Sequence, residues 1–411
     1  DATRQGRFEA RPWSVLLLAE GGRHDSCRML IVLGHRVARL NSDHIAELAD
    51  PISKWLCNHI EVLLTRFPKT FEIVWDVWID ALNKHSSPPP YRRPDRNWIE
   101  DGLNSPVGRI IHAVLSSTMC RELSPETDLP DAWQNRFNLL LDLPPHHRQH
   151  AISVMTERLH WLYHIAPQWV AERLFPLSKD SSADSDAFWD GHLSVRFHLQ
   201  PLLYQGLKAQ FPIVARSDTG RQHARELAEV LLKLWRYSRD EHGSECVISD
   251  DDLRDILVHA QEDVRLQVLF YLTTRSKESE DSDTSWREYI IPFLQNIWPR
   301  QSSVRTPQAS AQLVNLAFSI PEHCADIATI ILPWLQPFQG SMLYTHRSLL
   351  DEEALSDRYA ASVLDLLNAI LPQDGWQWPY GIQPILGCLE QHPATSGDPR
   401  LAELRRRKRR F

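Results

Sequence analysis

The sequence predicts an all-α protein: an α-solenoid of antiparallel helix pairs, HEAT- or armadillo-like, with no significant sheet. Three observations support this class. Glycine supplies 15 of 411 residues, about half of its usual share of ~7%, whereas the hairpin turns of a large β-protein need more. Apolar residues recur at spacings of three and four along most of the chain, and prolines repeatedly separate one such segment from the next.

The apolar spacing defines the expected helices, because residues three and four apart lie on one face of a helix. The pattern is clearest at Ile152, Met155, Leu159 and Leu162; at Ala224, Leu227, Val230, Leu231 and Leu234; at Trp286, Ile290, Phe293 and Ile297; at Cys324, Ile327, Ile331 and Trp334; and at Val363, Leu366, Leu367 and Ile370. No segment shows the sustained alternation of a half-buried strand. Each segment is therefore expected to be an amphipathic helix.

Prolines at the expected helix junctions give the length of the repeat. Phe67-Pro68, Ala166-Pro167 and Ile320-Pro321 each end one apolar segment and begin another. Proline suits the first turn of a helix because the N–H that it lacks would have no intrahelical partner there. The junctions predict helix pairs of about 40 to 50 residues, the size of a HEAT repeat. A non-repetitive helical domain that uses proline at helix starts is the alternative.

The predicted division of the chain follows its polar and proline-rich stretches. It comprises an N-terminal helical segment over 1–84, a proline-rich connector over 85–96, central helical repeats over 97–239, C-terminal helical repeats over 249–403 and a basic tail over 404–411. Residues 178–186, 240–252 and 275–285 are rich in Ser, Asp and Glu and are expected to be solvated loops. Ser249, with Asp252 three residues on, predicts a helix N-cap at the end of the second loop.

Composition and charge limit the locations and binding partners that we expect for the protein. The six cysteines are far apart without a C-x-x-C pair, so we expect neither a zinc ribbon nor a disulfide framework, and a cytoplasmic location. No apolar run approaches the ~18–20 residues of a membrane span. The formal net charge is −8, and the six cations at 405–410 leave −14 on the rest of the chain, which disfavours wrapping of nucleic acid. The start at Asp1 rather than Met favours an excised fragment of a longer protein.

Motifs for catalysis or cofactor binding are missing from the sequence. It contains no Gly-x-Gly, so Rossmann and Walker loops are excluded as recognisable motifs, and no G-x-S-x-G elbow. His146 with His150, and His160 with His164, have the i, i+4 spacing of two metal ligands, but no H-E-x-x-H accompanies either pair. A polar first turn of a helix is the favoured interpretation of His146 and His150, and helix-packing histidines are favoured for His160 and His164. We therefore predict no catalytic residue, no cofactor and no metal.

The one strong charge block is the C-terminal tail. Its six consecutive cations are candidates for contact with an acidic partner or with nucleic acid: Arg405, Arg406, Arg407, Lys408, Arg409 and Arg410. Arg92, Arg93 and Arg96 would add to a nucleic-acid surface. A mobile, solvated tail without a partner is the plainer interpretation of the same residues.

A further set of segments consists of helix caps, turns and tryptophan packing positions. They are Pro12-Trp13; Trp98 with Leu103-Asn104-Ser105-Pro106-Val107-Gly108; Leu129-Pro130-Asp131-Ala132-Trp133; Trp161-Leu162-Tyr163 with Ala166-Pro167-Gln168-Trp169; Ala187-Phe188-Trp189-Asp190-Gly191; and Pro292-Phe293-Leu294 with Ile297-Trp298-Pro299. Together they span residues 12 to 299. They resemble a helical domain at the C-terminal end of bacterial sirtuin-like (NAD-hydrolysing) antiphage defence proteins.

The resemblance implies a function for the chain. In such a system an N-terminal sirtuin-like module would cleave NAD upon phage infection, and the helical array would sense a phage protein or restrain the effector. This chain has no counterpart of the glycine-rich NAD pocket or of the catalytic histidine, so no functional residue is carried over. We expect a non-catalytic interaction and sensor module with a protein partner, with oligomerisation left open. A helical-repeat nucleic-acid-binding protein that uses the basic tail is the alternative.

Overall fold

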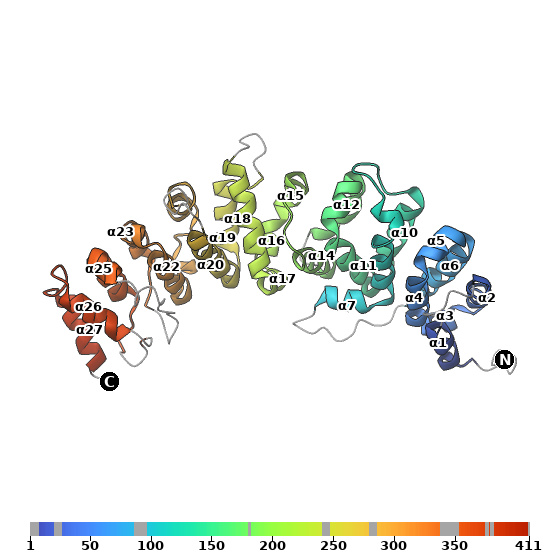
Figure 1. Cartoon of the computed structure of the whole chain (residues 1–411), viewed down its shortest axis with the longest axis horizontal. Coiled ribbons are helices and arrows are strands. Elements are labelled where there is room, and N and C mark those ends of the chain that lie inside the picture. Colours follow the sequence, from blue (N-terminus) through green and yellow to red (C-terminus); the bar gives the residue numbers. More distant parts are fainter. Residues whose placement is uncertain are drawn as a thin grey trace. The chain divides into compact units, whose positions relative to one another are not determined.

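The described part of the chain is entirely helical. A computed structural model describes residues 8–19, 27–85, 97–179, 182–240, 247–278, 286–337, 353–374, 378 and 382–409. These residues form helices and no strand, which confirms the predicted all-α class (Figure 1). They divide into two compact units, Asp1–Gln210 and Phe211–Phe411.

Unit 1 is built from short and medium helices, with several 3₁₀ or π segments labelled η. Its elements are α1 (Ala10–Ala19), α2 (Cys27–Val37), α3 (Ser42–Glu47), α4 (Ala49–Asn58), α5 (Ile60–Arg66), α6 (Pro68–Lys84), α7 (Trp98–Asn104), α8 (Pro106–Leu115), α9 (Thr118–Arg121), α10 (Asp131–Leu141), α11 (Pro145–Glu157), α12 (Leu159–Ile165), α13 (Pro167–Trp169), η2 (Val170–Leu174), η3 (Phe175–Ser178), α14 (Ala183–Leu193), α15 (Pro201–Leu207) and η4 (Lys208–Gln210).

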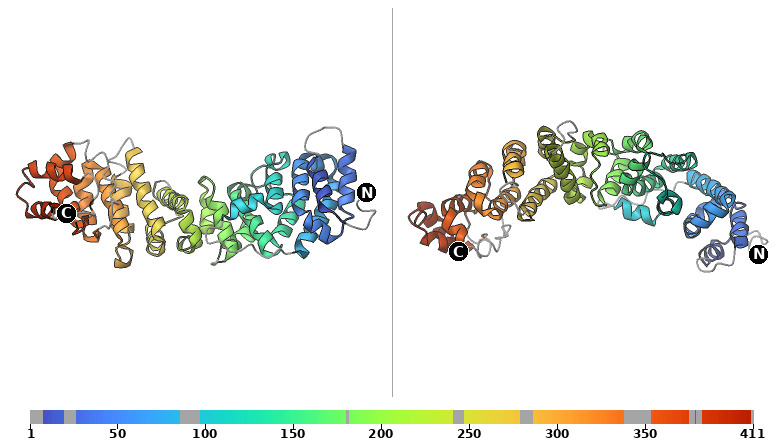
Figure 2. Two further views of the ribbon diagram at one scale, coloured as in Figure 1. Left: turned by 90° about the horizontal axis from the view of Figure 1, so that it is seen from below. Right: turned by 45° about the horizontal axis from the view of Figure 1, so that its top comes forward.

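The helices of unit 1 pack in succession. One row runs through α1, α4, α8, α11 and α14, each in contact with the next. Helix α6 packs against α2 and α3, and α7 lies against α8, α11 and α14. Helix α11 is enclosed on all sides over two turns, since every residue from Gln149 to Thr156 is buried. Figure 2 shows the same succession of helices from two further sides.

Glycines allow the close contacts around α11. A Cβ placed on Gly191 of α14 would lie 2.1 Å from the carbonyl oxygen of Ser153, and one on Gly102 would lie 2.6 Å from the Ser153 hydroxyl. A Cβ on Gly108 of α8 would lie 2.1 Å from the Gly102 carbonyl oxygen. These distances are shorter than van der Waals contact, so the helices approach one another through positions that only glycine fits.

Unit 2 contains longer helices. Its elements are α16 (Phe211–Val214), α17 (Asp218–Gln222), α18 (Ala224–Asp240), α19 (Asp250–His259), α20 (Glu262–Glu278), η5 (Trp286–Ile290), η6 (Phe293–Ile297), η7 (Ser302–Val304), α22 (Pro307–Ser319), η8 (Pro321–His323), α23 (Cys324–Ile331), η9 (Leu332–Trp334), α25 (Glu353–Ile370), α26 (Ile382–Gln391) and α27 (Pro399–Arg409).

Two rows of helices can be followed within unit 2. Helix α20 packs against both α18 and α22, and in the second row α19 lies between α16 and η6, which in turn contacts α23. Helices α25, α26 and α27 contact one another at the C-terminal end of the unit (Figure 1). Within this unit the chain thus alternates between the rows, as stacked helix pairs do. The continuous solenoid expected for the whole chain stays a prediction.

The helix positions largely follow the apolar spacing. All the apolar residues named for the five expected amphipathic segments are buried. The segment at Ile152 to Leu162 is not a single helix, because the backbone leaves helical geometry at Arg158, with φ −104° and ψ 19°, between α11 and α12. The segment at Trp286 to Ile297 contains two π-helical segments, η5 and η6. Pro68 and Pro167 begin helices as predicted, whereas Pro321 begins the short 3₁₀ segment η8 ahead of α23.

Some of the expected loops are shorter than predicted. Residues 183–186 belong to α14 and residues 275–278 to α20, so polar residues continue these helices at their ends. The predicted cap is confirmed: the Ser249 hydroxyl accepts the Asp252 N–H at 3.1 Å, and the Asp252 carboxylate accepts the Ser249 N–H at 2.9 Å. Apart from His85, the connector over 85–96 lies outside the described residues, as do Arg92, Arg93 and Arg96. The two units divide between Gln210 and Phe211, within the range predicted for the central repeats.

Candidate binding groove between α18 and α20

Helix α18 presents a polar stripe beside its buried face. Its apolar positions Leu227, Leu231 and Leu234 are fully buried. Arg225, Glu229 and Lys233 follow one another at four-residue spacing and so lie along one side of the helix. The Lys233 ammonium lies 2.5 Å from the Glu229 carboxylate, an i, i+4 ion pair.

Helix α20 presents the facing stripe. Its buried residues Val264, Val268 and Leu269 anchor it in the unit. On another side it carries Gln267, Phe270, Tyr271 and Thr274, spaced as i, i+3, i+4 and i+7 and therefore close together on its surface. The Phe270 ring is 52% exposed, which is unusual for a large aromatic side chain on a packed helix.

The start of α20 is fixed by polar contacts to neighbouring segments. The Gln261 N–H donates to the carbonyl of Ala215 at 2.7 Å, and the Gln261 side chain donates to the carbonyl of Arg216 at 2.8 Å. The Arg265 guanidinium, 7% exposed, donates to the carbonyl of Ala260 at the end of α19. Burial lowers the pKa of Arg265. These bonds hold α20 in place relative to α16, α17 and α19.

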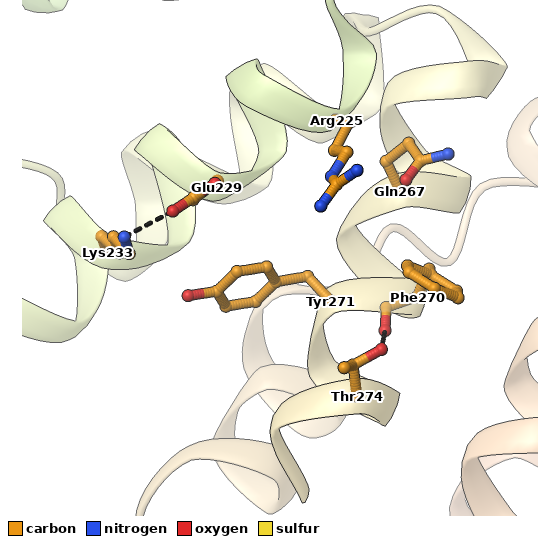
Figure 3. A pocket seen from close by; sticks show the side chains of 7 residues that line it. All are labelled: Arg225, Glu229, Lys233, Gln267, Phe270, Tyr271 and Thr274. Carbon is orange, nitrogen blue, oxygen red and sulfur yellow. Dashed lines mark hydrogen bonds and ion pairs between the residues drawn. The ribbon is translucent and has the colours of Figure 1, made fainter. Parts of the chain in front are cut away.

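The two stripes enclose a groove of about 260 Å³ (Figure 3). Its lining comprises Arg225, Glu229, Lys233, Gln267, Phe270, Tyr271 and Thr274. Arg225 points into the space from α18, and the Tyr271 ring extends across it from α20 towards the Glu229–Lys233 pair. The Thr274 hydroxyl donates to the Phe270 carbonyl at 3.0 Å. The groove therefore combines a cation, an amide, hydroxyls and aromatic surface.

The predicted basic tail is the last part of a helix. Residues 404–409 belong to α27, and Arg410 lies outside the described residues. Arg405 donates to Glu390 and to Gln383, both at 2.8 Å. Glu403 accepts hydrogen bonds from Arg406 and from Arg407.

Of the remaining cations of the tail, Lys408 has a described aromatic neighbour. The Lys408 ammonium lies 6.0 Å from the centre of the Trp378 ring. Arg409 is the last residue of α27. Four of the six predicted contact residues, Arg405 to Lys408, therefore have partners within unit 2. The expectation of a mobile tail is wrong for residues 405–409, because α27 packs against α25 and α26.

The predicted histidine pairs have separate surroundings. The rings of His146 and His150 meet edge to face with 4.3 Å between their centres, near the start of α11. His160 lies 5.3 Å from His192 and 5.2 Å from His198, whereas His164, one turn on, is exposed. Among the described residues, no group of three or more His, Cys, Asp or Glu side chains could hold a metal ion.

Burial keeps the side chains of His160 and His192 neutral, because it lowers the pKa of each. Burial, together with the neighbouring His160, lowers the pKa of His192 to about 3. Burial lowers the pKa of His160 to about 4, although its hydrogen-bond contact with Gln200, 3.2 Å from Nδ1 to Oε1, acts in the opposite direction. Its Nε2 lies 3.3 Å from the Tyr204 hydroxyl. This cluster fills the core of unit 1 near α12, α14 and α15.

The thiols of Cys57, Cys120 and Cys324 are poor nucleophiles. Burial raises the pKa of Cys57 and of Cys324 to about 12, and raises that of Cys120 as well. At neutral pH these side chains remain protonated, whereas a nucleophilic cysteine acts as the thiolate. None of them lines the groove.

The sequence did not reveal the groove. Its two stripes are about 40 residues apart, and each alone resembles an ordinary solvated helix face. A signal was present in the run of five apolar residues over 268–272, which is long enough to place Phe270 outside the buried face of the helix. Their position opposite Arg225 depends on how α18 packs against α20.

Comparison with known proteins provides one relative. An uncharacterized protein of Sinorhizobium fredii (strain NBRC 101917 / NGR234), y4cA, is 25% identical over 185 residues, which is 44% of this chain and 16% of that protein. The match thus covers about a sixth of the length of the curated relative. No family model and no solved structure matches the chain. No helix in the described part of the chain has both the length and the apolar content to cross a membrane.

Proposed function

We propose that the chain is a non-catalytic helical interaction module of the cytoplasm, which binds a protein partner in the groove between α18 and α20. The lining of the groove supports this proposal. Arginine, tyrosine and phenylalanine are enriched where proteins meet, because they combine large apolar area with hydrogen bonding or charge. Here all three occur in one hollow, at Arg225, Tyr271 and Phe270.

The composition of the groove favours binding over chemistry. A hydrolase or transferase needs a nucleophile or an activated water beside a base. The single carboxylate in the lining, Glu229, is in an ion pair with Lys233. The volume of about 260 Å³ is also below the ~300–1,000 Å³ of most small-molecule sites. An anchoring side chain of a partner fits such a space.

We further propose a regulatory setting. On the resemblance of residues 12–299, the module is the sensor or regulatory part of a bacterial antiphage defence protein whose effector is a sirtuin-like NADase. The segments that carry the resemblance support this through their structural roles: Gly108 and Gly191 make the close helix contacts of unit 1, and Trp133 and Trp169 are buried. A role as one module of a longer protein agrees with the comparison, because the matched segment is a small part of the relative's long chain.

Site-specific photo-crosslinking tests the interaction. A benzophenone amino acid in place of Gln267 samples the groove, and the same amino acid in place of Leu139, which is 48% exposed on α10, is the control. In phage-infected bacteria we expect a discrete protein adduct from position 267 and none from position 139. Equal labelling from both positions would contradict binding in the groove.

A second assay tests the non-enzymatic role. The purified chain is incubated with NAD, and the loss of NAD is measured over time. We expect no loss above that of the buffer. Turnover by this chain alone would overturn the proposal.

The nucleic-acid alternative has less support. It depends on the cations of 405–410, of which Arg405 and Arg407 are engaged with Glu390 and Glu403. Because Leu404 is fully buried, deletion of the tail would also damage the core. Alanine at Arg406, Lys408, Arg409 and Arg410 is the cleaner test. Salt-dependent DNA binding that these substitutions abolish would favour the alternative, and no binding at low salt would remove it.

A further inference from the structure

The groove contains a positive charge, that of Arg225, which no acidic side chain of the described residues neutralises. Arg225 is exposed and makes no ion pair or hydrogen bond within the described part of the chain. The nearest cations differ in this respect: Lys233 is paired with Glu229, and Arg221 lies 3.6 Å from Asp218. Asp263, one turn before Gln267, forms no ion pair with Arg225 although it belongs to the facing helix. The guanidinium is therefore left with all of its donors for a ligand.

The other lining groups complement a carboxylate on a peptide. Gln267, which lines the groove together with Arg225, offers an amide that can donate to a second carboxylate oxygen or to a peptide carbonyl (Figure 3). Beyond them lie the Tyr271 ring and the exposed Phe270 ring, which provide apolar surface for a neighbouring side chain. Charge and apolar area thus lie side by side, within the reach of two or three residues of a partner.

The same lining disfavours a nucleic-acid strand. A phosphate backbone is recognised by several cations at successive positions. In this groove one cation is unpaired, and the Glu229 carboxylate would face the next phosphate. A peptide with a single acid avoids this repulsion, because Glu229 keeps its own partner Lys233.

We infer that the groove recognises an acidic-apolar segment of its protein partner, with an aspartate or glutamate carboxylate held by Arg225 and Gln267 and an adjoining aliphatic or aromatic side chain packed on Tyr271 and Phe270. This inference rests on the proposed function and adds the chemistry of the partner to it. Arg225 provides the specificity for the acid, and the two aromatic rings provide the apolar contact.

A peptide array tests the preference directly. Each short peptide carries Asp or Glu beside Phe, Leu or Tyr, and each has a copy in which the acid is replaced by its amide. Retention of the labelled full chain is compared between the two copies. We expect the acidic copies to be retained about tenfold better, the size expected from hydrogen bonds to a charged group. Equal retention of acid and amide copies would overturn the inference.

Variants assign the preference to the groove. Arg225→Gln should remove the preference for acid, and Arg225→Glu should transfer it to copies with Lys in place of the acid. Phe270→Ala should weaken the retention on acidic and amide copies to the same extent, because it removes an apolar contact and leaves the charge of Arg225. Arg221→Gln is the matched control, since Arg221 lies outside the lining and should leave the preference unchanged. A preference that survives Arg225→Gln would place recognition elsewhere and refute the inference.

Two further outcomes separate this inference from the proposed function. A protein adduct from position 267 together with equal retention of acid and amide peptides would leave the interaction module in place and remove the acidic partner. Stronger retention of a labelled single-stranded oligonucleotide, lost in Arg225→Gln, would overturn both, because the groove would then bind nucleic acid.

Discussion

The Asp190 carboxylate on α14 accepts a hydrogen bond from the backbone N–H of Ile99 at the start of α7, at 2.8 Å. The two residues are 91 positions apart in the chain, and Asp190 is 3% exposed. The first N–H groups of a helix have no intrahelical acceptor, and the partial positive charge at that end stabilises a carboxylate. Asp190 thus caps a helix from a distant part of unit 1.

Loss of this cap should destabilise unit 1. We expect Asp190→Ala to lower the free energy of unfolding by about 1–3 kcal/mol, because a buried N–H loses its acceptor. Asp190→Asn keeps an oxygen acceptor and should cost less. Urea denaturation followed by tryptophan fluorescence measures both. The control is Asp142→Ala, which removes an exposed pair with Arg173 and should cost at most ~1 kcal/mol; equal losses at the two positions would contradict the capping role.

Two helical glycines should respond to alanine with opposite signs. At Gly191 the added Cβ would lie 2.1 Å from the Ser153 carbonyl oxygen, so α14 must move away from α11. We expect a loss of about 1–3 kcal/mol or more. At Gly387, inside α26, the nearest atom is 3.8 Å away, and alanine should stabilise the helix by up to ~1 kcal/mol. Thermal unfolding of Gly191→Ala and Gly387→Ala tests the pair, and equal melting temperatures would refute the close-contact argument.

The buried histidines should make the fold sensitive to acid. The pKa values of His192 and His160 are lowered to about 3 and about 4, from an ordinary value of 6.5. Below pH 6.5 the unfolded chain takes up protons at these sites while the folded chain does not. The free energy of unfolding should therefore fall as the pH decreases from 6.5 towards 4, by up to about 1.4 kcal/mol per pH unit for each histidine.

His192→Leu separates this effect from general acid unfolding. Neither ring nitrogen of His192 has a hydrogen-bond partner in the described structure, so leucine removes no bond and fits the apolar surroundings. The variant should show a shallower dependence of stability on pH between 6.5 and 4, measured by denaturation at a series of pH values. His259→Leu, at a side chain that is 49% exposed, is the control. An unchanged slope in His192→Leu would refute the assignment.

Exposed apolar side chains on α1 and α2 should promote self-association. Val15 and Leu18 are 60% and 46% exposed, and Met29 and Val32 are 44% and 46% exposed. Exposed apolar side chains on neighbouring helices mark surfaces that other proteins cover. Replacing these four residues with Glu and Lys in alternation should weaken self-association at least about tenfold, because apolar area is no longer removed from water. Sedimentation velocity at several concentrations measures this, with Leu139→Lys as the control; unchanged association would exclude this surface.

Local patterns in the sequence were sufficient for the helices but not for the sites. The spacing of Leu227, Leu231 and Leu234 predicts α18, and Ser249 with Asp252 predicts the N-cap of α19, because both patterns depend on residues within one or two turns. The extension of α20 through residue 278 was missed because polar residues are compatible with both a helix end and a loop. Tail residues such as Arg405 seemed free because Glu390 and Gln383 lie on another helix.

Features that join distant segments could not be predicted from one sequence. The contact of Asp190 with Ile99 and the position of Arg225 opposite Tyr271 both depend on which helix packs against which. The sequence around Gly191 does not indicate that this residue packs against Ser153 of α11. A spacing of three and four identifies the buried face of each helix, but it does not identify what covers that face.

The burial of α11 on all sides should determine which amino-acid substitutions this helix tolerates. Every position from Gln149 to Thr156 is buried, including polar Ser153, so α11 has no side along which substitutions are free. In a saturation mutagenesis screen with abundance as the measurement, most helices of this chain should show intolerance that rises and falls with each turn. Helix α11 should instead show an unbroken block of intolerant codons, and natural variants should accumulate least there.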